Sequence, residues 1–142
     1  MSGIDPTMFE LFRDEVRGHA DALGAGLVEA EARPSDPTLL DGLMRAAHSI
    51  KGAARIVNID TAVRLAHVLE DVLVAAQGGK IRLTSSGVDL LLRGSDVLVG
   101  LAALTPDGVA AWEAGNGPTV DALEPLLAAL AQGGPTPPGP PS

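Results

Sequence analysis

Apolar residues recur at spacings of three and four along most of the chain, and this pattern constrains the fold more than any other feature. Such spacing places the apolar side chains on one face of an α-helix. Strand-like alternation of useful length is absent, so we expect an all-α protein. The clearest stripe lies in the middle of the sequence and comprises Leu43, Ala47, Ile50, Ala54 and Val57.

Capping signals divide this pattern into segments. Asp-Pro pairs at 5–6 and 36–37 each combine an N-cap with a proline at the first helical position. Asp60 and Thr84 are the next candidate N-caps, and Asn58 suits a left-handed C-terminal cap. These signals predict helices over residues 6–32, 37–57, 60–77 and 84–104.

The last part of the chain is less regular. Residues 106–118, which include Trp112, contain several turn formers and are predicted to be a loop. Thr119 then opens a shorter fifth helix to about residue 130, and the Gly- and Pro-rich residues 133–142 read as a linker. The expected fold is an antiparallel up-down four-helix bundle with a fifth C-terminal helix, in one domain over residues 1–132.

Composition and charge exclude several kinds of site and argue against some partners. Only three residues are aromatic, so Leu, Val, Ile and Ala must build the core, and the absence of cysteine excludes disulfides and thiolate metal sites. A net charge of -8 argues against nucleic acid as a partner. No apolar run reaches the roughly 18 residues that a membrane span needs, and no signal peptide is recognised. We therefore expect a cytoplasmic protein.

His48 lies on the polar side of the second predicted helix. At about 100° per residue it falls roughly 140° from the centre of the apolar stripe. Lys51 and Gly52 follow at i+3 and i+4, beside the imidazole. The glycine costs the helix about 1 kcal/mol relative to alanine, but it leaves a bare patch for close approach. The three residues together predict a binding site for an anionic group.

The same stretch is a basic island in an acidic chain. Between residues 44 and 64, Asp60 is the only acidic residue, whereas the basic residues are Arg45, Lys51, Arg55 and Arg64. Ordinary surface scatter is the simpler explanation of such a pattern. Together with the exposed histidine, however, the island makes Gly52, Arg45 and Arg55 candidate binding residues.

The third predicted helix carries a second polar pair, His67 and Glu70, which are i,i+3 neighbours. A short turn joins the second and third helices, so we expect them to be antiparallel neighbours. If they meet on their polar sides, His48, Lys51, His67 and Glu70 converge.

This set permits phosphoryl transfer through histidine. A neutral imidazole is a good nucleophile near its ordinary pKa of about 6.5. A carboxylate that accepts a hydrogen bond from one ring nitrogen fixes the tautomer and leaves the other lone pair free. Glu70 is the candidate for that role, and Lys51 could offset the phosphoryl charge. The simplest alternative for each residue is an ordinary surface charge, as we expect for His19.

These residues also carry a resemblance to a known family. The segment His48-Ser49-Ile50-Lys51-Gly52-Ala53-Ala54 resembles the signature of histidine phosphotransfer (Hpt) domains. The segment Leu65-Ala66-His67-Val68-Leu69-Glu70-Asp71 resembles the "AHxxE" block of CheA-type chemotaxis kinases. The wider pattern, with Arg45-Ala46-Ala47 before the histidine and Ala75-Ala76-Gln77 later, is most similar to WspE-like hybrid kinases.

The resemblance implies a role for each residue of the site and for two partner domains. His48 would be the phosphorylated residue, Glu70 would bond its ring, and Lys51 and His67 would complete the network. A separate CheA-type ATP-binding kinase domain would supply the phosphoryl group, and a response-regulator receiver would collect it. ATP and Mg²⁺ would belong to these partners, so this domain, expected to be a monomer, needs no cofactor of its own.

Two alternatives from other classes stay open. The chain could be a non-catalytic helical interaction domain that has kept the Hpt shape. It could instead hold a metal ion with His48, His67 and Glu70, although Lys51 would repel the metal. Phosphorylation separates the first alternative from the phosphotransfer reading, and metal titration tests the second.

Overall fold

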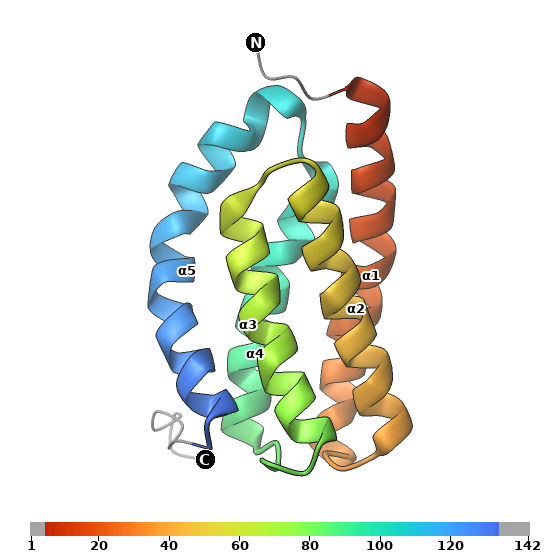
Figure 1. The fold of residues 1–142 in the computed structure, drawn as a ribbon, viewed down its shortest axis with the longest axis vertical. Helices are drawn as coiled ribbons and strands as arrows, with labels where there is room; N and C mark the ends of the chain where they lie inside the picture. Colours follow the sequence, from red (N-terminus) through yellow and green to blue (C-terminus); the bar gives the residue numbers. More distant parts are fainter. Residues whose placement is uncertain (1–4, 134–142) are drawn as a thin grey trace.

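The computed structural model describes residues 5–133 and is helical throughout, with short connections. The long helices are α1 (Pro6–Ala32), α2 (Pro37–Ile56), α3 (Asp60–Gln77), α4 (Ser85–Val99) and α5 (Val109–Ala131), with short 3₁₀ turns η1 (Gly100–Ala103) and η2 (Pro106–Gly108). The predicted fold class is confirmed: α1 to α4 run up and down, and α5 follows as a fifth helix (Figure 1). Most of the predicted linker, residues 134–142, lies outside the described residues.

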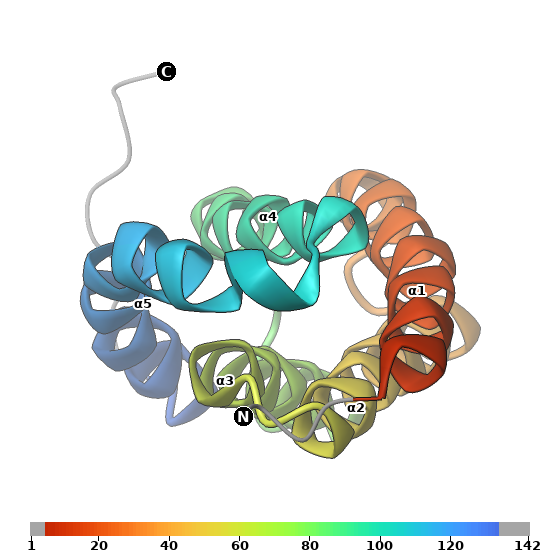
Figure 2. The same cartoon turned by 90° about the horizontal axis from the view of Figure 1, so that it is seen from above.

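The helices form a closed ring when seen from above (Figure 2). Contacts join α1 to α2, α2 to α3, α3 to α5, and α4 to both α5 and α1. Because α5 packs along α3, it is one of the helices that surround the core. Among residues 5–133, no helix covers the outer faces of α1 and α2.

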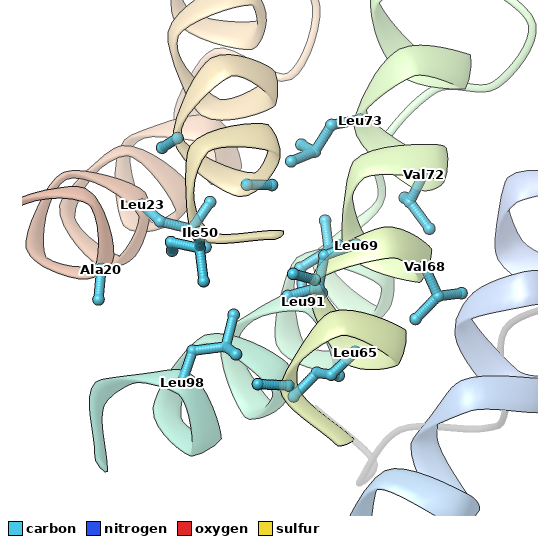
Figure 3. Close-up of a cluster of buried hydrophobic side chains, with 14 of the residues drawn as sticks. Ala20, Leu23, Ile50, Leu65, Val68, Leu69, Val72, Leu73, Leu91 and Leu98 are labelled. Atoms are coloured by element: carbon cyan, nitrogen blue, oxygen red, sulfur yellow. The ribbon is translucent and has the colours of Figure 1, made fainter. Parts of the chain in front are cut away.

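The predicted apolar stripes form the core. Phe9, Val16 and Ile50 are at most 1% exposed, and the entire stripe that Leu43 begins is buried. Side chains from opposite helices meet in the middle of the bundle (Figure 3); those labelled there include Leu23, Ile50, Leu65, Leu69, Leu91 and Leu98. Burial of this kind is the main stabilising term, at about 25 cal/mol per Å² of apolar surface.

The predicted caps hold with two corrections, at Asp60 and at Thr119, which lies inside α5 and does not begin it. Asp5 and Asp36 accept hydrogen bonds from backbone amides of the helices they open, and Asn58 has a φ of 59°, as predicted. Asp60, however, is the first residue of α3 and does not cap it. Glu113 of α5 accepts instead from the backbone amide of Thr61 at 3.2 Å and from its hydroxyl at 3.0 Å.

The prediction of a loop over residues 106–118 is wrong. These residues form η2 and the first ten residues of α5, which begins at Val109 although Pro118 lies inside it. Tertiary contacts override the local turn signals here, because Trp112 packs against the core and Glu113 bonds Thr61. The fourth helix is also shorter than predicted: it ends at Val99, and η1 continues it.

Candidate functional site

The core stripe of α2 sets the direction of His48. Ala47 and Ile50 are completely buried, which turns the His48 side chain outward with 65% of its surface exposed. The α2–α3 turn brings α3 back alongside α2. The exposed imidazole thus lies at the edge of the seam between the two helices.

Glu70 reaches His48 across this seam. His48 Nδ1 lies 2.6 Å from Glu70 Oε2, and Lys51 Nζ donates to Glu70 Oε1 at 2.5 Å. The side chains of Lys51 and Glu70 are only 14% exposed. When Nδ1–H donates to the carboxylate, Nε2 keeps its lone pair on a largely exposed ring, which is the arrangement that a nucleophilic imidazole requires.

The charge of Glu70 follows from its neighbours. Burial alone would raise the pKa of this carboxyl group, but the hydrogen bonds and charges of Lys51 and His48 outweigh burial and lower it. Glu70 is therefore ionised at neutral pH. An ionised carboxylate at Nδ1 also stabilises the positive charge that the ring gains when Nε2 forms a bond.

The structure does not bring His67 into this cluster. His67 is exposed on α3, and its Nε2 lies 3.4 Å from Asp71 Oδ2, one turn on along the same helix. Glu70 turns toward α2, whereas His67 and Asp71 share the outward face, which the i,i+3 spacing to Glu70 could not distinguish. His48, His67 and Glu70 therefore do not converge as the metal alternative requires.

The other candidate residues surround the ring. A Cβ built on Gly52 meets no neighbouring atom within 4 Å, so the glycine does leave open space. Arg45 lines a shallow groove with His48 and Glu70, and Arg55 is exposed further along α2. Lys51, predicted to meet the phosphoryl group, is engaged with Glu70; its role toward phosphate stays a prediction.

Sequence reasoning missed two features. Asp41 accepts hydrogen bonds from Arg45 on α2 and from Gln77 on α3, and the i,i+4 spacing of Asp41 and Arg45 was the available signal. An apolar hollow between α1 and α2 was also missed. It lies beside the histidine face and is lined by Met8, Leu11, Phe12, Glu15, Ala53 and Ile56.

Comparison with known proteins decides the family. The sequence model of the family described as "Hpt domain" matches residues 7–133. The chain belongs to the Hpt domain family. The resemblance carried by His48 and the following residues is thereby confirmed, whereas the finer similarity to WspE-like kinases and the boundaries 1–132 stay predictions.

The relatives of this Hpt domain include a sensor histidine kinase and chemotaxis proteins. The sensor histidine kinase CheAY of Helicobacter pylori is 38% identical over 78 residues, which are 55% of this chain and 10% of the relative. The chemotaxis protein CheA of Borreliella burgdorferi is 32% identical over 98 residues, 69% of this chain and 11% of the relative. This Hpt domain thus spans about a tenth of the length of these relatives.

Solved structures share its fold. The CheA phosphotransferase domain from Thermotoga maritima is 29% identical with a TM-score of 0.66, and the match covers 71% of this chain and 96% of that one. The phosphorylated P1 domain of CheA3, solved in complex with CheY6 from R. sphaeroides, is 22% identical with a TM-score of 0.72, covering 89% and 99%. No helix within residues 5–133 is long and apolar enough to cross a membrane.

Proposed function

We propose that this Hpt domain receives a phosphoryl group on His48 from the ATP-bound kinase domain of a CheA-type histidine kinase. We further propose that it passes the group to an aspartate of a response-regulator receiver. The contact between His48 Nδ1 and Glu70 carries the proposal, because an Nδ1–H that donates to the carboxylate leaves the Nε2 lone pair free on a side chain that is 65% exposed. The CheA kinases among its relatives support the donor, and the complex of the CheA3 P1 domain with CheY6 supports the acceptor.

The transfer needs little from the Hpt domain itself. The Nε2 lone pair attacks the γ-phosphorus of ATP, a P–N bond forms, and the bond to ADP breaks. Glu70 stabilises the charge that the ring gains. A carboxylate oxygen of the receiver then attacks the phosphorus, and the electrons of the P–N bond return to Nε2. ATP and Mg²⁺ are held by the kinase domain, and a further Mg²⁺ by the receiver.

The apolar hollow between α1 and α2 supports a docking surface for the receiver. Leu11 is 62% exposed and Ile56 is 64% exposed, which is unusual for large apolar side chains in one cluster. Ile56 lies two turns beyond His48 on α2, and Gly52 lies between them. A partner that covers this hollow would pass over Gly52 and reach the ring.

Phosphorylation by a CheA-type kinase that lacks its own Hpt domain tests the proposal. With ATP, we expect acid-labile phosphate on His48 and none on the His48→Gln variant. Label on His19 or His67, or undiminished label in the variant, would contradict the assignment. A non-catalytic interaction domain would bind partners and take up no phosphate.

The setting of the domain belongs to the same proposal. We place it in the cytoplasm, where ATP is available, and treat the isolated domain as a monomer, which sedimentation over a range of concentrations tests. The class of the parent protein is tested by the coding sequence downstream of Ser142. A dimerisation helix pair and an ATP-binding domain there would support a CheA-type kinase, and a receiver domain of its own would support the relation to WspE-like hybrid kinases.

A further inference from the structure

Two of the polar contacts that join α2 to α3 lie seven residues apart on each helix. His48 meets Glu70 in one contact, and Asp41 Oδ1 accepts from Gln77 Nε2 at 3.1 Å in the other. Seven residues rise about 10 Å along a helix. The Asp41 contact therefore lies about two turns from the histidine, toward the N-terminus of α2.

Arg45 lies between these two contacts. Its Nε donates to Asp41 Oδ2 at 2.8 Å, so Asp41 holds Arg45 with one oxygen and Gln77 with the other. The hydrogen bonds from Gln77 and Arg45 lower the pKa of Asp41, so its carboxylate remains charged at neutral pH. Gln77 thus anchors from α3 the carboxylate that orients the guanidinium.

The guanidinium still has donors to offer. Within residues 5–133, Asp41 is the one partner that bonds it, through Nε, so both Nη nitrogens keep free N–H groups. Arg45 lines the same groove as His48 and Glu70. Helical side chains lean toward the N-terminus, so the His48 ring leans over the turn that carries Arg45.

Lys51 is less available for an anion on the ring. Its ammonium donates to Glu70, its side chain is only 14% exposed, and the carboxylate already offsets its charge. Arg45 is 76% exposed and presents a planar fork of donors, which suits phosphoryl oxygens.

We infer that Arg45 binds the phosphoryl group on His48, and that Asp41 and Gln77 are positioning residues that hold its guanidinium at the groove. The inference rests on the proposed function, since it concerns the phosphorylated state of the same histidine. It assigns the charge-offsetting role to the exposed arginine, three residues before the histidine. Lys51 is left to fix Glu70.

A chemical phosphodonor tests this without any partner protein. Phosphoramidate can phosphorylate the imidazole: Nε2 attacks its phosphorus, the P–N bond of the reagent breaks, and ammonia leaves. The ³¹P shift of the phosphohistidine, followed against pH, reports the protonation of the phosphorylated imidazole, and a cation beside the phosphoryl group lowers its midpoint. The variants are Arg45→Gln and Gln77→Ala, with Arg93→Gln on α4 as the matched control. All three leave Asp41, Lys51 and Glu70 in place.

We expect Arg45→Gln to raise the ³¹P titration midpoint by about half a pH unit, the effect of a unit charge about 6 Å away in water. Gln77→Ala, which removes no charge, should raise it by less, and Arg93→Gln should titrate like the parent. Equal midpoints for Arg45→Gln and Arg93→Gln would overturn the role of Arg45. A parental midpoint in Gln77→Ala would overturn the positioning role.

The outcome is separable from that of the proposed function. A His48 that phosphoramidate leaves unlabelled would overturn both the inference and the proposed acceptor. A His48 that is labelled by phosphoramidate, shows the expected shifts, and exchanges with no kinase or receiver would contradict only the proposed partners.

Discussion

His48 Nδ1 and Glu70 Oε2 lie 2.6 Å apart although 22 residues separate them in the chain. The two side chains come from different helices, so the packing of α2 against α3 sets the distance. The reactive residue is exposed, whereas its partner is 14% exposed and is held by Lys51. The half of the site that must be rigid is therefore buried, and the half that must react is open.

Replacing Glu70 by Gln should slow phosphorylation of His48 by about 10–100-fold, the usual cost of losing an orienting carboxylate behind a histidine. The loss of unfolding free energy should stay near 1 kcal/mol, because one charged hydrogen-bond partner is removed. Asp71→Asn makes the same change on the next residue and should leave the rate unchanged. Initial rates and urea unfolding measure both effects. A variant that loses stability but keeps the parental rate would show that Glu70 is structural.

The lowered pKa of Glu70 predicts a dependence of stability on pH. A carboxyl group with a depressed pKa in the folded state stabilises the fold above its unfolded pKa, about 4.3 for Glu. That contribution is lost as the pH falls through the folded value. The stability difference between the parent and Glu70→Gln should thus be constant near neutrality and shrink below about pH 4. Urea unfolding at stepped pH measures it, and a difference that grows on acidification would contradict the sign.

Gly52 should act through access and not through folding. Gly52→Ala should gain up to about 1 kcal/mol of helix stability with little loss of phosphotransfer. Gly52→Gln should stay folded yet lose transfer to and from partners, because the new side chain fills the space beside His48. Gly42 is the matched control: it lies on α2, and a Cβ there also meets nothing within 4 Å. Melting curves and phosphoryl exchange with a receiver follow all variants.

For Gly42 we expect the same stability gain with Ala and parental transfer with Gln. If Gly52→Gln transfers at the parental rate, the glycine is not an access feature. If it unfolds while Gly42→Gln does not, the open space beside Gly52 is needed for packing.

The apolar hollow should matter to the receiver. Ile56→Lys should weaken receiver binding by at least tenfold, because a charge replaces an apolar side chain at the centre of a proposed contact. Val28→Lys is a close control, since Val28 is 63% exposed and Ile56 is 64% exposed. Titration calorimetry with a cognate receiver compares them. Equal affinities for the two variants would remove the hollow from the docking surface.

Glu113 should stabilise the start of α3. Glu113→Ala removes the acceptor for the amide and hydroxyl of Thr61 and should cost about 1 kcal/mol, as the loss of an N-cap does. Glu124→Ala, on the same helix but bonded at the surface to Arg64, should cost less. Thermal unfolding of both variants is the measurement. An unchanged melting temperature in Glu113→Ala would show that the capping contact contributes nothing.

The sequence predicts the parts of this fold that depend on periodicity. The stripes through Phe9 and Ile50 are buried as expected, and two Asp-Pro caps begin helices, because core burial and capping are local signals. The helical residues 109–118 escaped prediction, since contacts of Trp112 and Glu113 with distant residues outweigh the local turn formers.

In the candidate site, too, the features that depend on local spacing could be predicted and the others could not. The convergence of His48, Lys51 and Glu70 follows from helical spacing and a short α2–α3 turn, and the structure has it. The partner of His67 could not be predicted, because residues 67 and 70 are close neighbours on one helix and a small rotation decides which faces α2. The contact of Gln77 with Asp41 could not be predicted either, because it depends on the register between two helices.

The exposed imidazole of His48 has a kinetic consequence. A single nitrogen must meet both the donor phosphorus and the acceptor carboxylate, and one face of α2 leads to it. In the proposed relay, kinase and receiver therefore compete for the same surface, and each transfer must wait until the previous partner has left. Steady-state turnover then follows ping-pong kinetics, in which an excess of either partner inhibits the other half-reaction.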